Sequence, residues 1–280
     1  MKKVKILTDS SIQITPEEVE RYQITIVPLN VEVGGKQYID GETISREEFV
    51  EQMLHSDQVP KTSQPPLGRF VEAYDRLGQD GSPILAIIMT KSLSGTIDAA
   101  QQAAKMSQAD VTVFDSEYTD SALGFQVIKA AEMAADGATI EQIIPELEKI
   151  RDHTTLYVAI PTLENIVKGG RLGKMAATLT TLLNINVVVQ LKNYKLSVIK
   201  KGRGYKTIQH FVDEVMAEVL HDSQRLKGIG FSYVNDATMP KKLAQLVHEK
   251  VPKLQILTRV TSPVISTHTG KGAFAIIYYY

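Results

Sequence analysis

Short apolar runs alternate with helical patterns through the first half of the chain. Three of these runs are VKILTD at residues 4–9, ILAIIMT at 84–90 and VTVFDS at 111–116. Segments with a helical spacing of apolar residues lie between them. This alternation is typical of βαβ units, in which helices cover the faces of a parallel sheet. The sequence therefore predicts an α/β fold with a parallel sheet in this half.

The pattern changes near residue 152. Residues 185–200 carry alternating apolar and polar side chains on either side of a turn, which is typical of a β-hairpin. We therefore expect two α/β domains, with 280 residues being enough for both. The first, over residues 1–152, would hold the parallel sheet, and a smaller C-terminal domain over 153–280 would hold a mixed sheet.

Further elements are predicted in the second domain. Helices are expected from about residue 205 to 220 and from 238 to 250, and a buried strand at 273–280. Glycines interrupt a helical pattern over residues 163–184, and the segment 262–272 is predicted to be a glycine-rich loop.

Composition excludes several classes of function. The 31 Lys and Arg residues nearly cancel the 32 Asp and Glu residues, so no general positive field favours nucleic acid or an anionic membrane. The absence of cysteine excludes disulfides and thiolate catalysis. No apolar run approaches the roughly 20 residues that span a bilayer. We expect a soluble, cytoplasmic protein without stable membrane insertion.

Polar side chains follow the ends of three predicted strands. Asp9, Ser10 and Ser11 end the first, Ser92, Ser94 and Thr96 follow the second, and Asp115 and Ser116 end the third. The carboxyl ends of parallel strands lie along one edge of a sheet, where ligands bind. Ser94 could be a helix cap, or it could hold an anion at a helix N-terminus, with Gly95 allowing close approach to the backbone.

Two other loops carry candidate ligand-binding side chains. Thr62 and Ser63 lie in KTSQPPLGRF, and His268 lies in STHTGKGA. Each could equally be structural, the hydroxyls as turn caps and the histidine as a packed side chain. The remaining histidines show no metal-ligand spacing, so no metal site is predicted.

Two basic segments are broken by glycines, KGGRLGK at 168–174 and KKGRGYK at 200–206. They could be solvated helix and hairpin ends or a docking surface for a phosphate or an acidic partner. The basic residues concerned are Lys168, Arg171, Lys174, Lys201, Arg203 and Lys206.

Six motifs in order, LTDSS, TSQPP, LSGT, FDSEYTDSALGFQV, KGGRLGK and HTGKGA, give the chain a family resemblance. Together they resemble the DegV family of bacterial fatty-acid-binding proteins over nearly the full length. The resemblance implies an N-terminal parallel-sheet domain, a smaller C-terminal α/β domain, and one long-chain fatty acid such as palmitate, stearate or oleate. Its carboxylate would lie at the domain junction and its tail in an apolar tunnel.

The resemblance also implies a non-catalytic role without a cofactor. Such a protein presents the fatty acid to a separate ATP-dependent kinase subunit, which forms an acyl phosphate for phospholipid synthesis. Thr62, Ser94 and His268 would bind the carboxylate, and we expect the protein to be a monomer. The secondary candidates near the head group are Ser63, Gly95, Thr96 and Ser116, and the candidate partner contacts are Arg203 and Arg171.

The chain departs from the family pattern at three positions. Thr90 and Lys91 stand where relatives often have serines, and Lys271 stands where others have proline. These changes bear on chain preference and partner choice more than on the three head-group positions.

An acyl hydrolase or transferase is the alternative. In that case Ser94 would be the nucleophile, His268 its base, and Asp9 or Asp115 the orienting acid. The G-x-S-x-G elbow of α/β-hydrolases is missing around Ser94.

Overall fold

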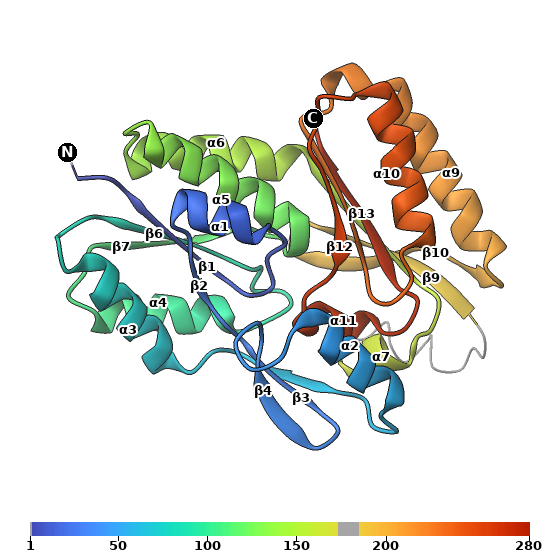
Figure 1. Cartoon of the computed structure of the whole chain (residues 1–280), viewed down its shortest axis with the longest axis horizontal. Coiled ribbons are helices and arrows are strands. Elements are labelled where there is room, and N and C mark those ends of the chain that lie inside the picture. Colours follow the sequence, from blue (N-terminus) through green and yellow to red (C-terminus); the bar gives the residue numbers. More distant parts are fainter. Residues whose placement is uncertain (1, 173–184) are drawn as a thin grey trace.

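The computed structural model describes residues 2–172 and 185–280 and consists mainly of two sheets with flanking helices (Figure 1). The first sheet is parallel and has the strand order β2-β1-β6-β7. Its strands are β1 (Lys5–Asp9), β2 (Thr25–Val27), β6 (Ile84–Ile88) and β7 (Val111–Asp115). The predicted parallel sheet is thus confirmed.

Helices cover both faces of this sheet (Figure 1). One face carries α1 (Pro16–Tyr22), α5 (Asp120–Ala135) and α6 (Ile140–His153), and the other carries α3 (Leu67–Gly78) and α4 (Thr96–Met106). Strand β6 is therefore buried along its whole length, as its unbroken apolar sequence requires. Helix α1 begins with a capping box, in which Thr15 accepts from the Glu18 backbone N–H and Glu18 accepts from that of Thr15.

A small antiparallel sheet extends from the first half. It has the order β4-β3-β5, and α2 (Arg46–His55) packs beside it. Its strands are β3 (Asn30–Val33), β4 (Lys36–Ile39) and β5 (Lys61–Ser63). The apolar run at residues 24–33 divides at Pro28, so that β2 enters the parallel sheet and β3 enters this one.

The second half is built on a mixed sheet with the order β10-β9-β8-β13-β11-β12. Its strands are β8 (Thr154–Ile160), β9 (Ile185–Lys192), β10 (Lys195–Arg203), β11 (Gly228–Tyr233), β12 (Ile256–Val260) and β13 (Phe274–Tyr279). Helices α9 (Lys206–His221) and α10 (Thr238–Lys250) cover its outer face (Figure 1), and a short 3-10 turn spans Ser223–Arg225. The predicted hairpin is confirmed, with Asn193 and Tyr194 at positive φ in its turn.

One predicted loop is instead a helix. Residues 262–272 include α11 (Pro263–Thr269), which begins at the Ser262 cap with Pro263 in its first turn. His268 therefore lies in the last turn of a helix and not in a glycine-rich loop. Of the interrupted helix predicted at 163–184, the structure describes α7 (Glu164–Lys168), and residues 173–184 lie outside the described residues.

The two halves share buried packing. Val234, Val264 and Ala273 belong to the core cluster of the first half, although they come from the second. We propose residues 152/153 as the division between the halves, one residue before the junction at which α6 ends at His153 and β8 begins at Thr154. Among residues 2–172 and 185–280, none of the helices combines the length and apolarity that crossing a bilayer requires.

Candidate functional site

A cavity lies between the inner face of the mixed sheet and the first half. The space between its walls is about 640 Å³, a volume that includes open solvent. Most of its walls are aliphatic. The lining residues are Leu29, Thr62, Met89, Leu93, Ser94, Thr119, Leu156, Val158, Ile160, Ile166, Arg171, Val189, Leu191, Leu196, Val264, Ile265, His268 and Thr269.

The register of the sheet explains the apolar wall. Side chains at paired positions of neighbouring strands point to the same face. Leu196 pairs with Leu191, which pairs with Leu156 on the next strand. Val189 pairs with Val158 in a parallel row. Three strands thus present a continuous aliphatic surface to the cavity.

Polar side chains from both halves meet at one part of the cavity wall. Thr62 on β5 and His268 on α11 are joined by a 2.9 Å contact between Oγ1 and Nε2, across a sequence separation of 206 residues. Ser94, just before α4, lines the same cavity. The three residues that the resemblance assigned to a carboxylate therefore border one space.

Helix α11 presents its cavity-lining side chains at helical spacing. Ile265, His268 and Thr269 are separated by three and four positions, which places them on one face of the helix. This helix packs against α2, α7, β3 and β5, so elements of both halves fix the position of His268.

Ser94 is held by its own loop. Its hydroxyl lies 2.8 Å from the Thr96 hydroxyl and 3.3 Å from the Thr96 backbone nitrogen, which donates to it. The N-cap of α4 is Gly95. The Gln64 side-chain amide lies so close to the Gly95 Cα that a Cβ added there would collide with the amide oxygen. Gly95 and Thr96 thus support Ser94 and do not line the cavity themselves.

Arg171 adds a positive charge to the cavity. It donates from Nε to the Leu93 carbonyl at 3.2 Å and from a terminal nitrogen to the Gly169 carbonyl at 2.6 Å. Its pKa is lowered by burial alone, and within the described residues no acidic side chain pairs with it. The sequence alone did not place Arg171 in the cavity. It left two alternatives for this basic residue after two glycines, a solvated helix end or a partner contact.

His268 is neutral in this environment. Burial, followed by the nearby Arg171 charge, lowers its pKa to about 3. Its Nδ1 atom is buried without a hydrogen-bond partner and faces the backbone of Gly169, where no Cβ would fit. The orphaned nitrogen is best left unprotonated, which places the ring hydrogen on Nε2, toward Thr62.

We expect His268 to weaken the lipid-free protein in acid. Its pKa is about 3 in the folded state against an ordinary value of 6.5, so unfolding takes up a proton below the ordinary value. The contribution of neutral His268 to the free energy of unfolding is fully present above pH 6.5 and is lost as the pH falls from 6.5 toward the folded pKa of about 3. The thermal midpoint of His268→Gln should therefore fall less than that of the wild type between about pH 8 and about pH 4.5. Equal falls would contradict this assignment.

Several other sequence candidates lie away from the cavity. Ser63 is exposed. The Ser116 hydroxyl is used in a local turn, donating to the Tyr118 carbonyl and accepting from the Tyr118 N–H. Arg203 is exposed at the end of β10, and Lys174 lies outside the described residues.

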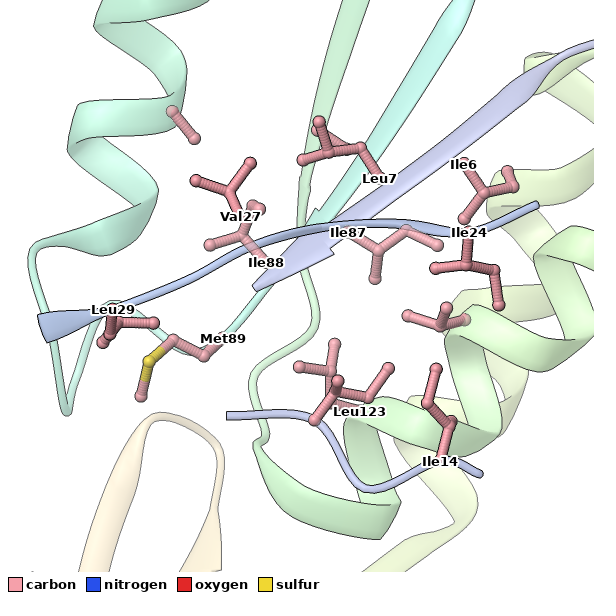
Figure 2. Packing of buried hydrophobic residues seen from close by; sticks show 14 of the residues in the cluster. Ile6, Leu7, Ile14, Ile24, Val27, Leu29, Ile87, Ile88, Met89 and Leu123 are labelled. Atoms are coloured by element: carbon pink, nitrogen blue, oxygen red, sulfur yellow. The ribbon is translucent and has the colours of Figure 1, made fainter. Parts of the chain in front are cut away.

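Asp9 and Ser10, at the C-terminal end of β1, hold the backbone of two cavity-lining residues. The buried Asp9 carboxylate accepts from the backbone N–H of Met89 at 2.7 Å, and the Ser10 hydroxyl accepts from that of Leu29 at 3.0 Å. Both Met89 and Leu29 line the cavity. In Figure 2 they lie at the same end of the core cluster of the first half. These side chains therefore position the wall and do not line the cavity themselves.

The catalytic triad of the hydrolase alternative is not assembled. His268 contacts Thr62 through one ring nitrogen, and the other has no partner. Asp9 accepts backbone N–H groups, and so does Asp115, from Glu117 and Lys91. No carboxylate therefore orients the imidazole among these described residues. In the described part of the chain, no group of three or more His, Asp or Glu side chains could hold a metal ion.

The fold and the cavity together define the class of protein. It is an α/β protein with two main sheets whose halves enclose a mainly apolar cavity, and the wall of that cavity carries four hydroxyls, an imidazole and a guanidinium.

The chain belongs to the DegV family, described as a family of uncharacterised proteins, which it matches over residues 3–280. It is 43% identical over 280 residues to a DegV domain-containing protein of Streptococcus pneumoniae, covering 100% of this chain and 99% of that protein. The family resemblance and the predicted fold class are thereby confirmed.

Solved structures with this fold include two described as fatty-acid-binding proteins. The first is DegV from Bacillus subtilis, with a TM-score of 0.90, 28% identity and coverage of 100% of both chains. The second is a DegV family protein from Thermus thermophilus, with a TM-score of 0.86, 28% identity and coverage of 99% of both chains.

Proposed function

We propose that this protein binds one long-chain fatty acid in the cavity. The observation that carries the proposal is the contact between Thr62 and His268, which places hydrogen-bonding groups from both halves on the wall of a mainly aliphatic space. The fatty-acid binding described for the Bacillus and Thermus relatives supports the same ligand class.

The apolar rows would hold the acyl tail. Burying a chain of about 16 carbons contributes on the order of 10 kcal/mol at ~0.8 kcal/mol per methylene, before ordering costs are subtracted. A carboxylate buried without partners would cancel much of that gain. A site for such a ligand therefore needs donors at its head group and few polar atoms elsewhere, and the lining residues meet both requirements.

The head group would receive its hydrogen bonds from hydroxyls. When His268 donates from Nε2 to Thr62, the Thr62 hydroxyl hydrogen is free to donate to a carboxylate oxygen. Ser94 can donate in the same way after releasing Thr96. The Arg171 guanidinium, which has no acidic partner among the described residues, would balance the negative charge.

We further propose that the protein presents its ligand to a separate kinase subunit. The sequence contains no G-x-x-x-x-G-K-[ST] phosphate-binding loop, so an ATP-using partner would supply the phosphoryl group. The carboxylate would then become an acyl phosphate for phospholipid synthesis. Arg203 is exposed and available for partner contact on this proposal.

Native mass spectrometry tests ligand binding most directly. We expect the purified protein to show an added mass corresponding to one long-chain fatty acid. The ligand should be released on denaturation and can be identified after organic extraction. Ser94→Ala and His268→Ala should each lose most of this ligand, because each removes a group at the head of the site. Ser63→Ala, a neighbouring exposed hydroxyl, should remain loaded.

Two outcomes would count against the proposal. An unloaded wild type that also fails to take up added palmitate or oleate would refute lipid binding. If the protein is loaded but a purified kinase subunit with labelled ATP forms no acyl phosphate from its ligand, the presentation role fails and the binding role stands.

A further inference from the structure

Lys91 reaches from the first half of the protein to the tip of the β9–β10 hairpin in the second. Its ammonium nitrogen lies 4.4 Å from the centre of the Tyr194 ring, within the ~6 Å of cation–π contacts. The Lys91 backbone N–H donates to the Asp115 carboxylate at 3.4 Å, which ties the residue to the first half. Lys91 does not line the cavity, so the proposed ligand leaves this departure from the family pattern without a role.

Tyr194 occupies a backbone conformation that favours glycine. The hairpin turn consists of Asn193 and Tyr194, whose φ angles are +49° and +60°. Asparagine followed by glycine is the usual choice for such a turn, and a bulky side chain at the second position is strained. The turn therefore presents an aromatic ring at a backbone cost, and that ring meets Lys91 of the other half.

The cavity wall adjoins this contact along both segments. Leu93, two residues after Lys91, and Leu196 pack against the apolar cluster that contains Leu191. All three leucines line the cavity, and Leu191 pairs with Leu196 one residue pair before the turn. We call the contact between residues 91–94 and the hairpin the loop–hairpin border. It has an apolar layer facing the cavity and the cation–π contact outside it.

The loop–hairpin border is held by side chains. Among the described residues, no hydrogen bond joins segment 90–95 to β9, β10 or their turn. Arg171, which donates to the Leu93 carbonyl, comes from beyond α7 and not from the hairpin. Strand β10 is at the edge of the described sheet, so its pairing with β9 is what holds it there. The hairpin tip can therefore separate from residues 91–94 without breaking a main-chain ladder.

The opposite side of the junction between the halves is hydrogen-bonded. Arg46 of α2 donates to the Val260 carbonyl at 3.0 Å, and Arg259 of β12 donates to the Ile14 carbonyl at 2.7 Å. Asp120 accepts hydrogen bonds from two hydroxyls of the second half. Several part-buried hydrogen bonds cost more to break than one exposed cation–π contact. The junction therefore opens most readily at the loop–hairpin border.

We propose that the fatty acid enters and leaves through the loop–hairpin border, and that the contact between Lys91 and Tyr194 is a clasp that holds this border closed. This inference rests on the proposed fatty-acid binding. Opening moves the hairpin leucines away from Leu93 and gives the acyl chain a path along their apolar surface. The border closes again because closure removes that surface from water.

A clasp on the entry route changes rates and leaves affinity unchanged. The fatty acid crosses the same border in both directions. Weakening the clasp therefore speeds uptake and release by the same factor, as long as the closed form remains the major state. A residue that only positions Ser94 behaves differently, because its loss weakens binding and speeds release alone. The two rates together distinguish a clasp from a structural support.

Lys91→Met removes the charge and keeps an unbranched side chain. With lipid-stripped protein and a fluorescent palmitate analogue in a stopped-flow instrument, we expect uptake and release each to become roughly two- to fivefold faster, the range of one exposed cation–π contact. Lys91→Arg keeps a cation over the ring and should behave as the wild type. Lys195→Met removes an exposed lysine next to Tyr194 and is the matched control, which should also behave as the wild type.

Tyr194→Asn removes the ring and suits the backbone of the turn. It should speed both rates as Lys91→Met does. The double variant should be no faster than either single variant, because both substitutions remove the same contact. Unchanged rates in Lys91→Met, additive effects in the double variant, or faster release with weaker affinity would each overturn the inference. An equal acceleration by Lys195→Met would also overturn it, since the effect would then be one of general charge.

A ligand-free measurement separates this inference from the proposed function. The chain has no cysteine, so Leu191→Cys introduces a single thiol, at a position that is 1% exposed. A thiol reagent reaches it when the border opens, so adding Lys91→Met should speed labelling roughly two- to fivefold, and adding Lys195→Met should not. Equal labelling with and without Lys91→Met would overturn the clasp. Faster labelling in a protein that binds no palmitate would refute lipid binding and leave the clasp in place.

Discussion

Val158→Glu should abolish fatty-acid binding in a protein that still folds. Val158 lies in the apolar row of β8, paired with Val189 and Ala275, and points into the cavity. A glutamate there would face unfilled space, so it need not displace packed neighbours. Its charge would meet the acyl chain in a region without compensating partners. We expect affinity to fall by on the order of 100-fold or more, measured with a fluorescent fatty acid and by native mass spectrometry.

The control for this substitution lies on the neighbouring hairpin. Ile199 on β10 is 37% exposed and does not line the cavity. Ile199→Glu should therefore bind fatty acid as the wild type does. Circular dichroism establishes that both variants are folded. A folded Val158→Glu protein that remains stoichiometrically loaded would show that the tail does not lie along this sheet.

Gly169→Ala should have the second largest effect. Gly169 ends α7 with an ordinary helical φ of −69°, so backbone conformation does not require glycine there. Space does, because a Cβ would collide with His268 Nδ1 and lie 2.9 Å from the Asn165 carbonyl. The methyl group would displace His268 from Thr62 or move the chain that carries Arg171. We expect at least roughly tenfold weaker fatty-acid binding, comparable to losing one charged hydrogen bond.

Gly170→Ala provides a matched control for this loop. Gly170 has a φ of +74° and open space where a Cβ would be placed. Alanine there costs about 1 kcal/mol of backbone strain and should lower the thermal midpoint without weakening ligand binding. Unchanged affinity in Gly169→Ala would mean that the position of His268 does not affect head-group binding.

The strand and helix pattern of the sequence was sufficient for most of the fold. Buried strands such as β6 are unbroken apolar runs, and Thr15 with Glu18 marks the start of α1 in sequence as clearly as in structure. The small sheet was missed because β5 has three residues, two of them exposed, and so lacks a periodic signal. Ser262 and Pro263 do carry a helix-start signal, but the glycines that follow α11 favoured a loop prediction.

The candidate site was predicted in part. Thr62, Ser94 and His268 were named from the family resemblance, and the structure brings them to one cavity. Arg171 was not predicted to line the cavity, because sequence does not show which way a long side chain turns.

The contact between Thr62 and His268 also bears on how the protein is made. The ribosome synthesises Thr62 206 residues before His268. At the usual 5–20 residues per second, roughly 10–40 seconds separate the two. During that interval the N-terminal half can fold around its own sheet, but the head-group site lacks its imidazole and the cavity lacks α11. A nascent chain that ends before α11 therefore lacks part of the proposed lipid site.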